Sequence, residues 1–420
     1  MKKLSRYSIG MGDRFAHQAN FHLKAVIETE KQGFEITPVW NKSNREHITI
    51  GSEPLDARKA VDKAIKELGW NKPYFIDADH INIDTVDRFM ESSDFFTIDV
   101  AAYIGKQGDN SDKEEFLKKI EQYIGSFSVP GIEKPFTISK EEVAAIADQY
   151  LFAAKMAGET YKKIAAGKGV GNFITEVSMD EVPNPQKPAE LFFILAMLSH
   201  YNIPVQTIAP KFTGRFNKGV EYVGDPIAFA EEFEANLMVI DYAIKTFNLP
   251  EELKLSVHSG SDKFSIYDSI RELTQKHNKG FHLKTAGTTW LEEVIGLAMA
   301  GGEALDFVKD IYARAIVDVE KLCAPYADVI DIKTEQLPTA ETVNSWSSDD
   351  FDNALRHIPN HPQYDPNMRQ LMHVGYKLAA DKIEKYNVLL EKHADIVGQC
   401  VFENIYDRHL KRLLNLKTFV

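Results

Sequence analysis

The sequence predicts an α/β protein, a (β/α)8 barrel of the TIM type with a helical insertion after the fourth strand and a helical C-terminal extension. Over the first two thirds of the chain, short apolar segments alternate with helical patterns, as in parallel strands joined by helices. Eight such segments are present, the number that closes this barrel. An open, doubly wound sheet is the alternative, because alternation along the chain does not determine closure. The predicted strands are residues 5–12, 35–41, 73–80, 95–101, 172–181, 204–212, 253–260 and 280–287.

Two stretches lie outside this repeating pattern. Residues 102–170 hold a Gly, Asp, Asn and Ser loop at 105–112 and two helical patterns, which indicates an insertion on the barrel. Residues 336–366 are rich in Pro, Asn, Asp and Ser, and two helices are predicted after them. We therefore expect a barrel domain over residues 1–335 and a helical extension over residues 336–420 that packs on it.

Composition excludes several classes of protein. The formal net charge of −13 disfavours nucleic-acid binding, which needs clustered Lys and Arg. No segment approaches the run of about 18 apolar residues that a membrane span requires, and the N-terminus lacks the apolar region of a secretory signal. The two cysteines, Cys323 and Cys400, are far apart, which fits a reducing cytoplasm. We expect a cytoplasmic protein without nucleic-acid or membrane partners, and composition leaves a homo-oligomer open.

Strand periodicity places polar side chains inside the barrel. In residues 253–258 the apolar side chains share one face, whereas Lys254, Ser256 and His258 share the other. The outer face packs on helices and must be apolar, so the polar face points inward, toward the carboxyl end where this fold carries its chemistry. His80 stands at the corner where a strand meets its loop. The same alternation predicts that further polar side chains point inward: Asp77, Asp79, Thr97, Asp99, Glu176, Ser178, Asp180, His282 and Lys284.

Such a cluster of buried charges needs compensation, because each isolated charge is costly to bury. A divalent metal ion satisfies carboxylates and imidazoles together, and zinc, manganese and nickel all suit these ligands. Single residues have plainer interpretations. His282 alone suits a hydrogen-bonded core histidine, Asp77 suits a helix cap, and Lys284 suits a partner of a core glutamate. The metal hypothesis depends on several strands converging.

Three loops are candidates for binding an anion. Residues 259–263 and 285–289 are small, hydroxyl-bearing loops that lead into helices, where backbone N–H groups can hold a carboxylate or phosphate. Ordinary strand–helix turns with Ser or Thr caps are the alternative. After the first strand, Gly10 and Gly12 allow close backbone approach, and Arg14 suits a bidentate carboxylate contact.

Several strings together resemble the tagaturonate epimerase family. Residues 255–265 (LSVHSGSDKFS) and 281–287 (FHLKTAG) are the most specific, and the matches run in order from about residue 8 to 376. The resemblance implies a divalent metal and the interconversion of D-tagaturonate and D-fructuronate, so the expected partner is a small sugar acid. The other matching strings are residues 12–14, 78–80, 96–99, 176–181, 218–219 with Tyr222 and 224–225, and 369–370 with 373–374.

These two sugar acids differ at C4, whose hydrogen is not acidified by the ketone at C2. One route oxidises and re-reduces C4 with a nicotinamide, but the dinucleotide fingerprint would need a glycine where Phe15 stands. The other route cleaves the C3–C4 bond by a retro-aldol reaction and re-forms it after the new aldehyde has turned. Residues 79–80 and 258–261 are similar to the metal-binding strings of class II aldolases, which favours the second route.

Roles follow from this hypothesis. Metal ligands would be His80, His258 and His282, with Glu176 or Glu181 as a fourth. Catalytic residues would be Asp79, Glu176, Asp180 and Lys284. Substrate-binding residues would be Arg14, Asp99, Lys211, Ser259, Asp262, Lys263 and Thr285. A class II-type aldolase or sugar isomerase acting on a related keto-sugar is the alternative enzyme. A non-catalytic sugar-acid binding protein is the alternative outside enzymes.

Overall fold

The computed structural model describes residues 1–285 and 288–417, and its centre is a closed barrel of eight parallel strands. The strand order is β1-β10-β9-β8-β7-β4-β3-β2, so the predicted barrel is confirmed over the open sheet. Each strand overlaps its predicted segment, and residues 286–287 of the last one lie outside the described residues. The strands are β1 (Tyr7–Gly12), β2 (Ile36–Ser43), β3 (Phe75–Ile81), β4 (Phe95–Asp99), β7 (Ile174–Ser178), β8 (Thr207–Ala209), β9 (Lys254–Val257) and β10 (Phe281–Thr285).

Within the described residues, every barrel strand except β2 is shorter than predicted, and the differences at β8 and β9 bear on the pocket. β8 spans three residues where 204–212 were expected, and Pro210 follows it directly. Proline has no N–H to donate to a neighbouring strand, so the ladder ends there. β9 ends at Val257, and His258 therefore begins the loop at the barrel mouth. Short strands at this edge leave more of the chain free to shape the pocket.

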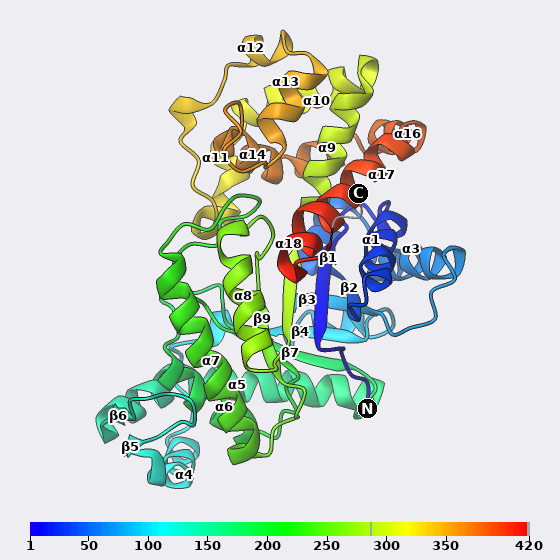
Figure 1. The fold of residues 1–420 in the computed structure, drawn as a ribbon. Helices are drawn as coiled ribbons and strands as arrows, with labels where there is room; N and C mark the ends of the chain where they lie inside the picture. The colour runs from blue at the N-terminus through cyan, green and yellow to red at the C-terminus, as the bar shows by residue number, and fades with distance from the viewer. Residues whose placement is uncertain (286–287, 418–420) are drawn as a thin grey trace.

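Helices surround the barrel, as Figure 1 shows. The pattern of proline at the first helical positions recurs in α3, α6 and α7, where its missing N–H costs no hydrogen bond. The layer is formed by α1 (Ala19–Lys31), α2 (Asn44–Ile50), α3 (Pro54–Glu67), α5 (Lys140–Lys168), α6 (Pro188–His200), α7 (Pro226–Phe247), α8 (Phe264–Lys276) and α9 (Thr288–Ala300).

The insertion after β4 is confirmed, and it holds a hairpin that the sequence did not predict. The two predicted helices are α4 (Asn110–Lys119) and α5, and between them β5 (Gly125–Phe127) pairs antiparallel with β6 (Phe136–Ile138). Three residues per strand are too few to show an alternating pattern. Aromatic contacts attach the hairpin to the barrel helices: the ring centroids of Phe127 and Phe192 are 4.7 Å apart.

We call the helical part of the chain from Gly302 onward the C-terminal extension. It begins before residue 336, where the sequence predicted its start, and lies over the carboxyl end of the barrel in Figure 1. It has its own apolar cluster, in which Phe15 of the barrel packs against Trp290 and Tyr386. Its helices are α10 (Gly302–Val317), α11 (Val319–Cys323), α12 (Ala340–Asn344), α13 (Ser348–Leu355), α14 (Pro366–Val374), α15 (Tyr376–Ala380), α16 (Ile383–Lys392), α17 (Ala394–Glu403) and α18 (Lys411–Leu414), with a π-helical turn at Asn404–Leu410.

No helix in the described ranges combines the length and the apolar character needed to cross a membrane.

The extension meets the barrel layer where α17 crosses α9 at a glycine. A Cβ added to Gly296 would lie 2.6 Å from the Cα of Val397, so the two helix backbones approach too closely for a side chain. We predict that Gly296→Ala lowers the free energy of unfolding by about 1–3 kcal/mol through overpacking. Urea denaturation followed by circular dichroism measures this change.

Gly167→Ala is the matched control, since Gly167 is also helical but its added Cβ would meet only the flexible Met90 side chain at 3.4 Å. There alanine should leave stability unchanged or raise it by up to about 1 kcal/mol, from its higher helix propensity. Equal effects of the two substitutions would contradict the proposed close crossing.

Candidate active site

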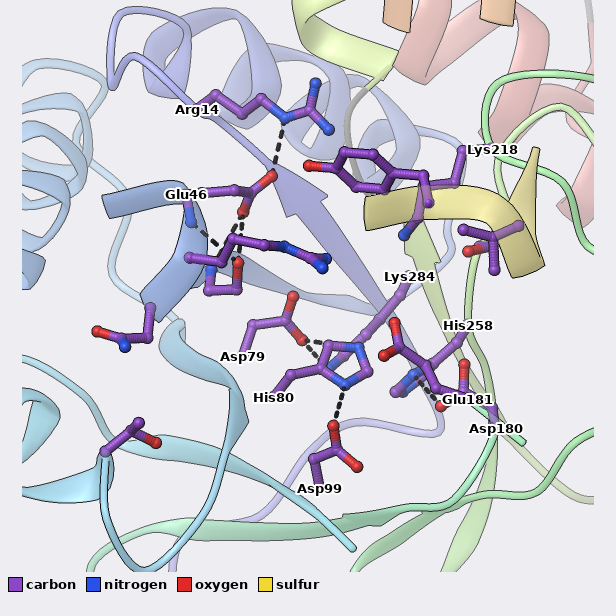
Figure 2. Close-up of a pocket in the computed structure, with 17 residues that line it drawn as sticks. Arg14, Glu46, Asp79, His80, Asp99, Asp180, Glu181, Lys218, His258 and Lys284 are labelled. Carbon is purple, nitrogen blue, oxygen red and sulfur yellow. Dashed lines mark hydrogen bonds and ion pairs between the residues drawn. The ribbon is translucent and has the colours of Figure 1, made fainter. Parts of the chain in front are cut away.

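A pocket opens at the carboxyl ends of the barrel strands. It encloses about 1060 Å³, part of it open to solvent, and combines carboxylates, imidazoles and cationic side chains. Figure 2 shows that these side chains come from several strands and converge on one space. The labelled residues lining it are Arg14, Glu46, Asp79, His80, Asp99, Asp180, Glu181, Lys218, His258 and Lys284.

At the pocket floor, Lys284 is surrounded by carboxylates from two other strands. Its Nζ lies 2.8 Å from Asp77, 2.9 Å from Asp79 and 2.8 Å from Glu176, and all four side chains are buried. Burial alone would lower the pKa of Lys284, but the three carboxylates raise it well above its usual value. Lys284 is therefore a fixed ammonium whose main contacts are with protein rather than with solvent.

Within this cluster the pKa values of two carboxyl groups shift in opposite directions. Burial raises the pKa of Asp77 to about 7, more than Lys284 lowers it. Burial also disfavours charge on Glu176, but there Lys284 and His258 prevail and hold its pKa well below the usual range. Thr97 joins the groups, since its hydroxyl lies 2.9 Å from Asp77 and 3.1 Å from Glu176.

His258 connects this floor to the pocket wall. Its Nε2 is hydrogen-bonded to Glu176 at 2.9 Å, and its Nδ1 lies 3.0 Å from Asp180 Oδ1. The Ser178 hydroxyl donates to the same Asp180 oxygen at 2.5 Å. Burial lowers the pKa of His258, but the nearby carboxylates, Asp180 first among them, raise it to about 9.

A bulge in β3 turns His80 toward the same wall. The pairing of β3 with β4 shifts register between Ala78 and Ile81, and His80 has a φ of 50°, in the left-handed region. Simple alternation would send residues 79 and 80 to opposite faces, whereas the bulge lets both line the pocket. The His80 and His258 rings lie 5.3 Å apart and nearly perpendicular.

Two groups of side chains could hold a metal ion. His80, Asp180 and His258 each offer a ligand atom, and these atoms lie within 4.8 Å of one another; His80, Asp99 and Glu181 form a second, overlapping group. Two of the three predicted metal ligands, His80 and His258, are thus together. Glu181 belongs to the second group, whereas Glu176 lies beneath His258, engaged by Lys284.

His282, the third predicted ligand, belongs to neither group. It is fully buried inside the barrel, where its Nδ1 is 2.9 Å from the Ser8 hydroxyl and its ring packs against Phe95. Burial lowers its pKa to about 3, so the imidazole is neutral. Its environment is that of a hydrogen-bonded core histidine, the plainer interpretation that its sequence pattern also allowed. His282 points into the barrel, as the alternation predicts, but its depth along the barrel axis keeps it from the pocket.

Arg14 lines the pocket, yet its guanidinium is largely engaged. Nε donates to Glu46 at 2.8 Å, and the two terminal nitrogens contact the backbone carbonyl and Nε2 of His373 at 2.9 and 3.0 Å. The group also lies 4.0 Å from the centroid of the Tyr376 ring. Arg14 therefore attaches the extension to β1, and few of its donors remain for a ligand.

The other predicted binding residues divide into two sets. Ser259 lines the pocket, and Lys211 lines an adjoining cavity that shares Asp180 and Ser259 with it. Asp262 and Lys263 do not line the pocket. Both are buried, and Asp262 accepts a hydrogen bond from Arg369 whereas Lys263 donates one to the carbonyl of Asn217. The Thr285 hydroxyl donates to the carbonyl of Gly10 at 2.7 Å, and part of its predicted loop, residues 286–287, lies outside the described residues.

Several residues of the pocket wall have no role that the sequence predicted: Arg45, Glu46, Lys218, Tyr326 and Val329. All lie on loops, short helices or the extension, where no two-residue alternation marks a side chain as facing inward. Lys218 stood in a string that matched the family, which was the one available signal for it.

A closed (β/α)8 barrel whose mouth brings together imidazoles, carboxylates and cationic side chains is typical of an enzyme that acts on small polar metabolites. Comparison with known proteins narrows this class. The model of the UxaE tagaturonate epimerase family matches residues 1–415. The chain belongs to the tagaturonate epimerase family, as its strings predicted, and is thus an isomerase, a carbohydrate epimerase.

Two relatives illustrate the likeness. The tagaturonate/fructuronate epimerase of Thermotoga maritima is 27% identical over 427 aligned residues, which cover 98% of this chain and 80% of the relative. A glycerol-bound crystal structure of the fructuronate-tagaturonate epimerase UxaE from Cohnella laeviribosi superposes with a TM-score of 0.81 at 23% identity, over 99% of this chain and 82% of that one. The native crystal structure of the same enzyme also gives 0.81, at 22% identity. These crystal structures support the fold.

The three contacts of Lys284 yield a stability prediction. Lys284→Met removes the one ammonium shared by Asp77, Asp79 and Glu176 and leaves these buried carboxyl groups without the cation that lies among them. We expect a loss of about 3–5 kcal/mol in the free energy of unfolding, the usual cost of breaking a buried ion pair. Lys66→Met, at an exposed position of α3, should change it by less than about 0.5 kcal/mol. A Lys284 variant as stable as the Lys66 variant would show that the three ion pairs of Lys284 do not stabilise the fold.

Proposed function

We propose that this chain interconverts D-tagaturonate and D-fructuronate, using a divalent metal ion and retro-aldol cleavage of the C3–C4 bond. Family membership and the name of the Thermotoga maritima relative support the substrate pair. The observation that carries the mechanism is the convergence of His80, Asp180 and His258 on one wall, with Asp79 beside them in the same pocket.

The residues of this wall fit a metal ion. Within the described residues, the Nδ1 atoms of His80 and His258 are buried and have no hydrogen-bond partner. The Nδ1 of His258 faces Asp180 Oδ1 at 3.0 Å without the geometry of a hydrogen bond, as two ligands of one cation would. Imidazole nitrogens with a carboxylate oxygen suit zinc, manganese or nickel. Such an ion would act as a Lewis acid on the ketone and the adjacent hydroxyl oxygen of the substrate.

Cleavage of the C3–C4 bond accounts for the carboxylate of Asp79 beside the proposed metal ligands. The C4 hydrogen is not acidic, so inversion at C4 proceeds through its hydroxyl group. Asp79 would accept the C4 hydroxyl proton while the C3–C4 electron pair moves to C3, where it is conjugated with the C2 carbonyl, and C4 becomes an aldehyde. Lys284, 2.9 Å from Asp79, keeps this carboxylate oriented from below.

Inversion then requires the aldehyde to present its other face. The fragment that carries C4 to C6 turns about the C4–C5 bond, C3 attacks the opposite face of the aldehyde, and the new C4 oxygen takes up a proton. This oxygen now points to the other side of the pocket. Figure 2 shows Asp79 on one side of His80, and Asp180 with Glu181 on the other. We assign Glu181 to hold the proton at this second oxygen position.

Deuterium at C4 distinguishes this route from removal of the C4 hydrogen as a proton that exchanges with solvent. We expect D-tagaturonate labelled with deuterium at C4 to yield D-fructuronate that keeps the label, as followed by proton NMR in ordinary water. The C4–H bond is never broken in the retro-aldol route. Washout of the label would reject that route, and accumulation of separate three-carbon fragments would indicate the alternative aldolase.

Chelation and substitution test the two parts of the site separately. Dialysis against a chelator should abolish turnover, and addition of a divalent metal should restore it; full activity in demonstrably metal-free enzyme would refute the metal proposal.

Asp79→Asn should keep the bound metal, measured by mass spectrometry, and lower kcat by about 10²- to 10⁴-fold, as expected for loss of a general base. An Asp79→Asn enzyme with unchanged kcat would remove Asp79 from the mechanism.

A further inference from the structure

The pocket has a cationic side that the proton transfers above do not use. Lys218 and Arg45 line it together with Tyr326, and in Figure 2 Lys218 lies across the pocket from Asp99 and His80. The acidic and imidazole side would hold the ketone end of a substrate. The opposite side therefore faces the other end of an extended sugar acid, which is its carboxylate.

Lys218 is an available cation. Its ammonium forms no ion pair and no hydrogen bond within residues 1–285 and 288–417, and the side chain is half-buried in the pocket wall. Arg14 on the same side is already engaged by Glu46 and His373. Arg45 is exposed at the rim, with its guanidinium 4.8 Å from the centroid of the Tyr326 ring. Lys218 is thus the pocket-lining cation that combines partial burial with free donors.

The backbone around Lys218 is held on both sides by buried cations. Lys263 Nζ donates to the carbonyl oxygens of Asn217 and Val220 at 2.8 and 2.6 Å, and Arg369 Nε donates to that of Gly219 at 2.5 Å. The N–H of Lys218 itself donates to the carbonyl of Val329 at 2.9 Å. The loop is therefore fixed at four consecutive residues while the Lys218 side chain stays free.

The cations that hold the loop are themselves paired. Arg369 is fully buried, and its terminal nitrogen lies 2.8 Å from Asp262, which is also fully buried. Lys263 donates a third bond to the carbonyl of Ser261 at 2.9 Å, so one ammonium joins the loop after β9 to the loop after β8. Buried charges of this kind are costly unless they are matched, and here they fix geometry. This explains why Asp262 and Lys263 stand beneath the pocket and not in it.

We propose that Lys218 binds the carboxylate of the sugar acid and thereby selects uronates, with Lys263, Asp262 and Arg369 as positioning residues for its loop. The assignment rests on the proposed function, because it takes the ketone end to lie at the metal wall. The ligand chemistry is a carboxylate at the end of an open-chain polyhydroxy acid. A lysine presented on a rigid loop suits it, since little of the binding energy is spent on ordering the loop.

Lys218→Met tests this proposal through the split between KM and kcat. We expect the KM for D-tagaturonate to rise about 10- to 100-fold, the range for losing one hydrogen bond to a charged group. The bound metal and the thermal midpoint should stay as in the parent enzyme. Lys218→Arg should recover a large part of the affinity. Lys134→Met, which removes an exposed positive charge on the distant insertion, is the matched control and should leave KM unchanged.

A pair of non-reacting ligands gives a readout that does not require turnover. D-galactonate and galactitol share one carbon skeleton and differ in the terminal carboxylate. Calorimetry should show that Lys218→Met weakens galactonate at least about tenfold and leaves galactitol unchanged. Equal affinities of parent and variant for galactonate would overturn the proposal, as would an effect that appears with Arg45→Met instead. A parent enzyme that binds galactonate through Lys218 but does not convert tagaturonate would refute the proposed function and leave this inference standing.

Discussion

The ammonium of Lys284 is the interaction on which the active site depends. Three carboxylates from β3 and β7 meet it inside the barrel, and each would repel the others without it. The arrangement forms the floor of the pocket and orients Asp79 upward. Through Glu176 it also fixes His258, whose Nε2 is hydrogen-bonded to that carboxylate, so that Nδ1 points at Asp180. One buried cation thereby determines the orientation of both the proposed base, Asp79, and a proposed metal ligand, His258.

The mouth of the barrel adds departures from regular strands to this floor. The bulge in β3 and the left-handed φ of His80 bring two successive residues into the same pocket. Ser259, after β9, also has a positive φ, of 47°, beside His258. Strain of this kind persists where surrounding contacts impose it, and here it lies at the edge where the chemistry is proposed. The regular barrel supplies rigidity, and these irregular residues aim the functional groups.

The C-terminal extension completes the pocket and decides which cations face it. It supplies Tyr326 and Val329 to the wall and engages Arg14 through His373. It also supplies Arg369, which holds the loop that presents Lys218. The extension therefore engages the guanidinium of Arg14 and positions the loop that carries Lys218. This division of roles between two cations forms the polarity of the pocket, with an acidic and imidazole side opposite a cationic one.

Sequence alone predicted eight parallel strands, the insertion and the helical extension, and the convergence of Asp79, His80, His258 and Lys284, because alternation and the family strings both depend on local order. The closure of these strands into a barrel was decided by the tertiary structure. Tertiary structure decided what local order does not encode. The distance of an inward side chain from the barrel mouth separates His282 from the other two predicted ligands. Competition among distant partners decides which cations are engaged and which stay free. The depth of a side chain and the pairing of a cation both depend on contacts between segments hundreds of residues apart. The periodicity of a single strand contains no information about such contacts.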